Sequence, residues 1–385
     1  MKLRVIRRRS VYKKVLRNSL LDEKRNSELA GLIWILHLDK YLTLLLRLMV
    51  LLGFPVCLSL ACYAVTDLFL AREPTPGPSP AALVTVVPPT AALNATCPNL
   101  TADILDVARY GTTSGDGLGS AKNSEVEATY LVTYLVRGDR IGAANLESVP
   151  VEFLDERDDN AAHEAAWEYF TALIPADERS MLAAYVVITD GPQNILGAVS
   201  QIRTADRWAL EIDIEDARDA HDLTYTLLHE FGHLLTLNEG QVPPSRAVFN
   251  NPDDDALLES EAAACPQYFP GEGCSNPGSY INKFYNRFWT GIHGEWLEID
   301  LQEDQNAYED QLGVFYRKYR DQFVSDYAVT SPAEDAAETW TYFVLDSKPD
   351  GDSIAEQKML FFYEHPELVQ LRTEILGNIC ESFPQ

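Results

Sequence analysis

The chain has 385 residues, of which 46% are hydrophobic and 23% are charged, a composition that excludes disordered and collagen-like proteins. Its net charge of −27 is unevenly distributed. Residues 1–47 contain 12 Lys/Arg and 4 Asp/Glu, whereas the remaining 338 residues contain 19 Lys/Arg and 54 Asp/Glu. Such an acidic body repels phosphate backbones, so we expect no nucleic-acid partner. The basic end and the acidic body meet at a hydrophobic segment, which argues against a simple cytosolic enzyme.

That hydrophobic segment, residues 48–71, is predicted to be a single transmembrane signal anchor. Leu48–Thr66 contains no charged residue and is about as long as a helix that crosses the hydrocarbon core. The alternatives are a buried core helix, for which the segment is long, and a cleaved signal peptide, which rarely follows so long an N-terminal region. The positive-inside rule makes residues 1–47 a cytoplasmic basic tail and places the acidic body outside the cytoplasm.

Residues 72–100 are rich in proline and are predicted to form an extended linker that holds the body away from the membrane. The rest of the chain, residues 101–385, is predicted to be one extracytoplasmic domain, because its length suits one two-lobed domain better than two separate domains.

Four cysteines remain outside the predicted anchor, and an even number in an oxidising compartment predicts two disulfide bonds. Three pairings are possible. The loop between Cys265 and Cys274 is short and rich in proline and glycine, which favours a bond between these two. Cys97 would then pair with Cys380.

Hydrophobic periodicity in the body predicts a mixture of helices and short strands. A helical pattern covers residues 156–173, 220–238, 302–323 and 333–345. Runs of β-branched or alternating residues predict strands at 181–189, 198–203 and 208–214, and residues 241–300 are loop-rich. We therefore expect an α+β fold, with a small mixed sheet, one long central helix and a mainly helical C-terminal lobe.

The clearest chemical signal is the segment His229-Glu230-Phe231-Gly232-His233, within the predicted helix 220–238. Histidines four residues apart lie on one helical face, so both imidazoles can bind one tetrahedral Zn²⁺. Glu230 projects from the neighbouring position and can act as a general base on water in the open coordination site. A structural histidine pair is the alternative, but without a metal these side chains would be costly on a Leu-rich buried helix.

A catalytic zinc needs a third protein ligand, and three places in the chain offer a carboxylate. The first is Glu239, although the glycine turn that would bring it back to the metal is missing. The second is the predicted helix 333–345 and its start, where Glu334 and Glu338 lie one turn apart on one face. The third is the run Asp253–Asp255, which is more simply explained as a solvated or Ca²⁺-binding loop.

The two motifs at residues 229–233 and 326–338 together resemble the gluzincin metallopeptidases, in particular the catalytic domain of anthrax lethal factor and related secreted zinc peptidases. There, H-E-F-G-H is followed by S-Y-x-x-T-x-x-x-E-F-F-A-E. This sequence has Asp326 in place of the serine and Asp335-Ala336 in place of the two phenylalanines. The resemblance covers two short motifs and their order, and it does not extend to residues 241–325.

The resemblance implies a zincin-like fold and a role for each matching residue. The zinc ligands that it implies are His229, His233 and Glu334. Glu230 would be the general base, and Tyr327 would stabilise the oxyanion of the tetrahedral intermediate. Glu338 would accept an N–H from a ligand histidine and fix its tautomer.

We therefore expect a membrane-anchored zinc metallopeptidase that hydrolyses peptide bonds of a peptide or protein substrate outside the cytoplasm. The alternating strand 208–214, just before the central helix, is a candidate for pairing with an extended peptide. The main alternative is a catalytically inactive zinc-binding surface protein that binds peptides or cell-envelope partners. A further alternative is an adhesion or structural module without a metal.

Overall fold

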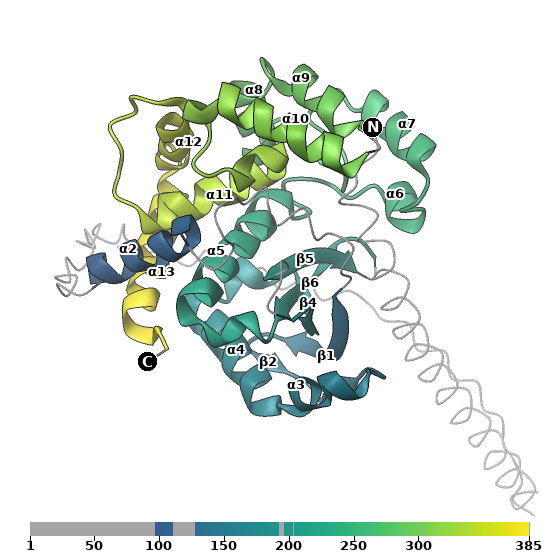
Figure 1. Cartoon of the computed structure of the whole chain (residues 1–385), viewed down its shortest axis with the longest axis vertical. Helices are drawn as coiled ribbons and strands as arrows, with labels where there is room; N and C mark the ends of the chain where they lie inside the picture. Colours follow the sequence, from purple (N-terminus) through teal and green to yellow (C-terminus); the bar gives the residue numbers. More distant parts are fainter. Residues whose placement is uncertain (1–96, 111–127, 192–195, 203, 303, 385) are drawn as a thin grey trace, which may run out of the picture. The chain divides into compact units, whose positions relative to one another are not determined.

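The computed structural model describes residues 97–110, 128–191, 196–202, 204–302 and 304–384, which all belong to one compact unit (Figure 1). The predicted cytoplasmic tail, the predicted anchor and most of the predicted linker lie outside the described residues. Among the helices that are described, none combines the length and apolar character needed to cross a membrane.

The N-terminal part of the described body is built on a mixed β-sheet. Its strands are β1 (Thr129–Arg137), β2 (Arg140–Ile141), β3 (Asn145–Leu146), β4 (Leu182–Thr189), β5 (Gly197–Ile202) and β6 (Arg207–Asp213). They follow the order β2-β1-β4-β6-β5, and β3 pairs with β1. β4 and β6 are parallel, and the other pairs are antiparallel. The small mixed sheet is therefore confirmed, and β1 is a strand that the sequence analysis did not predict.

The position of β6 shows that the prediction of peptide pairing by strand 208–214 was wrong. β6 pairs with β4 on one side and with β5 on the other, so both of its edges are occupied. The prediction failed because alternation along a strand indicates which side chains are buried but does not give the order of strands in the sheet.

Helices make up most of the C-terminal part, as expected for the α+β fold. The described α-helices are α2 (Cys97–Tyr110), α3 (Leu154–Asp158), α4 (Asn160–Leu173), α5 (Ala220–Leu237), α6 (Arg246–Asn250), α7 (Asp255–Ala264), α8 (Tyr280–Phe288), α9 (His293–Asp300), α10 (Gln305–Lys318), α11 (Pro332–Leu345), α12 (Ile354–Tyr363) and α13 (Pro366–Ser382). The 3₁₀ segments are η2 (Val151–Phe153), η3 (Asp177–Arg179), η4 (Asp216–Arg218), η5 (Arg320–Gln322) and η6 (Tyr327–Thr330).

Two predicted helices and one predicted loop region differ from the structure in detail. The predicted helix 156–173 is divided into α3 and α4, because Asp159 follows the last residue of α3 and its side chain caps α4 by accepting the N–H of Ala162. The predicted helix 302–323 ends earlier, at the end of α10. Residues 241–300 contain the short helices α6 to α9 instead of being mainly loops.

Helix α5 lies between the sheet and the C-terminal helices and links the two parts of the core (Figure 1). On one side it packs on β5, where a Cβ added at Gly197 would lie 2.7 Å from Cγ2 of Thr226. Helix α4 packs beside it against the sheet, with the Trp167 ring 5.4 Å from the ring of Tyr185 in β4. Because α5 is buried along its length, its side chains are held in fixed positions.

The disulfide between Cys265 and Cys274 is present as predicted, with Cα atoms 5.4 Å apart. Cys380 in α13 is also disulfide-bonded, whereas the side chain of its predicted partner, Cys97, lies outside the described residues. All cysteine side chains that the structure describes are therefore in disulfide bonds.

Candidate metal centre

Helix α5 carries the H-E-F-G-H segment and places it in the protein interior. Asp219 begins the helix by accepting two backbone N–H groups of the first turn. Asn238 follows its last residue and donates its side-chain amide to two carbonyl groups of the last turn. Every residue from Thr226 to Leu237 is buried, so both histidines and Glu230 lie in a largely desolvated environment.

Helix α11 carries the second motif and approaches α5 closely. Its first turn is stabilised by Ser331, whose Oγ accepts the N–H of Glu334 at 3.0 Å, and by Pro332 at the first helical position. The two helices meet at Gly232, where a Cβ would lie only 3.0 Å from Cα of Ala337. A larger residue would push the helices apart, so Gly232 sets the distance at which Glu334 reaches the histidines.

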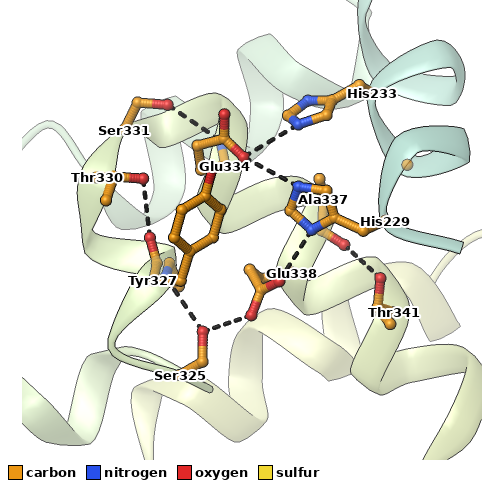
Figure 2. Close-up of polar contacts among 12 residues, drawn as sticks. His229, His233, Ser325, Tyr327, Thr330, Ser331, Glu334, Ala337, Glu338 and Thr341 are labelled. Carbon is orange, nitrogen blue, oxygen red and sulfur yellow. Dashed lines mark hydrogen bonds and ion pairs between the residues drawn. The ribbon is translucent and has the colours of Figure 1, made fainter. Parts of the chain in front are cut away.

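Three side chains converge between α5 and α11 (Figure 2). Oε2 of Glu334 lies 3.0 Å from Nε2 of His229 and 3.1 Å from Nε2 of His233. These ligand atoms all lie within 4.8 Å of one another, so the three side chains can reach a common ion. Two imidazole nitrogens and one carboxylate oxygen form a donor set that catalytic zinc sites use. The residues therefore fit a zinc ion.

Burial, hydrogen bonds and neighbouring charges shift the pKa values of His229 and Glu334. Burial opposes a charge on His229, yet its hydrogen bonds to Glu334 and Glu338 raise the pKa of this histidine well above its usual value. Burial also opposes the ionised form of Glu334, but the charges of His233 and His229 hold the pKa of this carboxyl well below its usual range. Metal ligands must be deprotonated, so a cation at this point would displace the proton from Nε2 of His229.

Glu338, one turn beyond Glu334, fixes the orientation of His229. Its Oε1 accepts a hydrogen bond from Nδ1 of His229 at 2.9 Å. Its Oε2 accepts hydrogen bonds from the hydroxyl groups of Tyr225 at 2.8 Å and Ser325 at 2.5 Å. A neutral His229 that donates from Nδ1 keeps the lone pair of Nε2 available for a metal.

The two residues predicted to act on the substrate lie on α5 and on η6, the 3₁₀ segment that precedes α11. Glu230 follows His229 on α5 and is 6% exposed. Tyr327 lies in η6 and is 39% exposed, with its ring centroid 5.8 Å from that of His229. Figure 2 shows this ring extending from η6 toward Glu334. Tyr327 is thus both next to His229 and accessible from solvent.

The structure brings the pair of histidines together with Glu334 and not with the other carboxylates that the sequence offered. Glu239 lies beyond the end of α5 and is exposed. In the run Asp253–Asp255, Asp254 is the N-cap of α7 and accepts the N–H of Leu257. Neither alternative joins the histidine group among the described residues.

Two residues of the centre, Tyr225 and Ser325, were not identified from the sequence. Tyr225 lies four residues before His229, so helical spacing places it on the same face but does not indicate its partner. Ser325 is close to the second motif but outside its pattern, and no local signal connects it to Glu338. Both are found only when α5 and α11 are placed side by side.

A second group of carboxylates lies at the ends of β4 and β6, where Asp190, Asp213 and Asp216 have ligand atoms within 4.8 Å of one another. Asp213 is fully buried and accepts the backbone N–H groups of Asp190 and Glu215. Burial raises the pKa of Asp213 to about 6. Burial, together with the negative charges of Asp213 and Asp190, raises the pKa of Asp216 to about 7. The usual value is 3.8.

This group predicts a loss of stability as the pH rises. The folded chain retains protons on Asp213 and Asp216 that the unfolded chain releases near pH 4, so the free energy of unfolding falls between about pH 4 and 7. Asp216→Asn should therefore raise the free energy of unfolding at pH 8 by about 1 kcal/mol after solvent screening, which corresponds to a rise of ~2 °C in the melting temperature. At pH 4 the substitution should change the melting temperature little. Thermal unfolding across this range tests the prediction. Asp310→Asn, at an exposed position, is the control, and an equal gain in both variants would contradict it.

Comparisons of this chain with known protein families, curated proteins and solved structures give no match.

Proposed function

We propose that the protein is a gluzincin-type zinc peptidase in which His229, His233 and Glu334 bind the metal. The observation that carries this proposal is the convergence of two imidazole Nε2 atoms and one carboxylate oxygen between α5 and α11. Glu230 on the same helix and Tyr327 beside His229 provide the other groups that hydrolysis of a peptide bond requires.

Each residue has a separate task in the proposed reaction. A bound zinc ion supplies Lewis acidity, which lowers the pKa of water and polarises the scissile carbonyl group. Glu230 accepts a proton from the attacking water and then donates it to the leaving amine. The Tyr327 hydroxyl donates a hydrogen bond to the carbonyl oxygen as negative charge develops on it. Glu338 holds His229 in the tautomer that binds metal through Nε2.

The proposed place for an extended peptide is the outer edge of β5 rather than β6. No strand among the described residues pairs with that edge. The contact of Gly197 with Thr226 places the start of β5 one helical turn before Glu230. Backbone hydrogen bonds along the strand would then hold a peptide beside α5.

We also propose that the peptidase domain lies outside the cytoplasm and is tethered by the hydrophobic segment 48–71. The uncharged length of this segment supports a membrane anchor. The disulfide-bonded cysteines support an oxidising compartment. Peptides or proteins of that compartment are then the substrate class.

Metal removal tests the proposed function directly. We expect the purified protein to contain stoichiometric zinc and to hydrolyse members of a broad peptide library. Treatment with 1,10-phenanthroline should abolish hydrolysis and added Zn²⁺ should restore it, whereas the non-chelating 1,7-isomer should have no effect. Bound zinc without hydrolysis would favour the inactive zinc-binding protein instead. A protein that retains no zinc after gentle purification, and takes up none, would contradict the metal site.

A further inference from the structure

Ser325 lies directly before Asp326 and η6, and its hydroxyl group makes two hydrogen bonds. It donates to Oε2 of Glu338 at 2.5 Å and accepts the backbone N–H of Ala328 at 3.1 Å (Figure 2). The first bond reaches the carboxylate that orients His229. The second closes the turn on which Tyr327 lies. A single hydroxyl group therefore connects the histidine side of the centre with the tyrosine side.

We infer that Ser325 is a positioning residue that fixes Tyr327 relative to His229. Its catalytic consequence rests on the proposed peptidase function, whereas the positioning itself does not. Asp326 occupies the N-cap position of η6 but makes no side-chain capping hydrogen bond. Ser325 supplies that bond instead, from one residue earlier in the chain.

The packing of the turn explains why this bond matters for Tyr327. Ala328 and Val329 are fully buried, so they hold the middle of η6 in the core. Tyr327 itself is 39% exposed, and a side chain with so much open surface is held less firmly by packing. Its position therefore depends on the backbone of the turn as well as on its own contacts, and Ser325 ties this backbone to Glu338.

The hydrogen bonds of Glu338 predict that loss of the Ser325 hydroxyl group affects catalysis and metal binding differently. Glu338 would still accept hydrogen bonds from Tyr225 and His229, so the orientation of the histidine and its affinity for zinc should persist. The turn that carries Tyr327 would lose its connection to the metal ligands. The rate of hydrolysis should then fall, whereas the affinity for zinc should not change.

Kinetic measurements on the full-length protein test this separation. Ser325→Ala should lower kcat about 10-fold, since small displacements of a positioned group cost up to about 10²-fold, and should leave KM and the zinc dissociation constant within about two-fold. Ser325→Thr keeps the hydroxyl group and should restore kcat. In a Tyr327→Phe background, Ser325→Ala should have little further effect, because the group that it positions is already lost.

The matched control is Thr330→Val, because Thr330 donates to the carbonyl group of Tyr327 within the same turn but has no bond to Glu338. We expect its kcat to stay within about two-fold of the wild-type value. An equal loss in both variants, or additive losses in Ser325→Ala and Tyr327→Phe, would overturn the inference, because any damage to the turn would then suffice.

A measurement without turnover separates this inference from the proposed function. In protein labelled with 3-fluorotyrosine, the ¹⁹F resonance of Tyr327 is assigned by its loss in Tyr327→Phe. Ser325→Ala should shift or broaden this resonance, and Thr330→Val should not. An unchanged resonance and an unchanged kcat in Ser325→Ala would refute the positioning role. A changed resonance in a protein that hydrolyses no peptide would sustain the positioning role and refute the peptidase.

Discussion

Replacement of Glu230 by glutamine is expected to lower kcat for peptide hydrolysis by about 10²- to 10⁴-fold without loss of zinc. Glutamine has nearly the same size, but its amide cannot accept the proton of the attacking water. The proposed metal ligands His229, His233 and Glu334 are unchanged, so zinc content should remain stoichiometric. Steady-state kinetics and metal analysis of the same sample give both quantities.

The matched control for this experiment is Glu239→Gln. It makes the same change of charge near the end of the same helix, but at an exposed residue outside the histidine group. We expect wild-type kcat and zinc content from this variant. Undiminished turnover in Glu230→Gln would refute its assignment as the base. Loss of zinc in Glu239→Gln would show that the third ligand had been assigned to the wrong carboxylate.

The local part of the candidate site can be derived from the sequence, because helix geometry alone determines it. Two histidines four residues apart must share a face of α5. The capping residue Ser331 and Pro332 indicate the start of α11, and Glu334 and Glu338 follow at helical spacing. Helix geometry does not determine which carboxylate meets the histidines, because that depends on how α11 packs against α5 at Gly232.

The residues that the sequence did not reveal act across larger separations or outside a pattern. Tyr225 bonds to Glu338 across 113 positions, and hydroxyl groups are too common for such a pairing to be guessed. Ser325 is only 13 positions from Glu338, but it lies in an irregular segment with no helical or strand spacing. Hydrogen-bond partners of this kind depend on tertiary structure, whereas the spacing of the two histidines depends on secondary structure alone.

The fold shows the same difference between local and non-local information. The strands β4, β5 and β6 were predicted from β-branched and alternating residues, but their order in the sheet was not. β1 consists mainly of Thr, Tyr, Leu and Val, so its composition is that of a strand and the same local signal applies to it. The division between α3 and α4 depends on one residue, Asp159, whose capping role competes with a continuous apolar pattern.

At Asp335 this chain differs from the gluzincin motif. There the structure contains a buried ion pair that the local sequence does not predict. Oδ2 of Asp335 lies 2.6 Å from Nζ of Lys358 in α12, and both side chains are fully buried. Trp289 also donates to Oδ2 of Asp335, and Lys358 lies over the ring of Phe323. Burial lowers the pKa of Lys358 and raises that of Asp335, so each charge is stabilised mainly by the other.

Lys358→Met is therefore expected to reduce the free energy of unfolding by about 3–5 kcal/mol, because it leaves the carboxyl group of Asp335 buried without its cation. The double variant Asp335→Asn/Lys358→Met removes both charges and should recover most of this loss, since asparagine still accepts the hydrogen bond from Trp289. Urea unfolding of the metal-free protein measures these differences.

The control is the exposed ion pair between Lys318 and Glu295, which has nearly the same length, 2.7 Å, but side chains that are 54% and 41% exposed. Lys318→Met should leave the unfolding midpoint unchanged, because water stabilises the remaining charge. If Lys358→Met were equally harmless, the buried pair would contribute no stability. Asp335 adjoins Glu334, so a destabilised Lys358→Met variant should also bind zinc more weakly, and the double variant should regain that affinity. The ion pair would then stabilise both α11 and the position of Glu334, the carboxylate that α11 presents to the histidines.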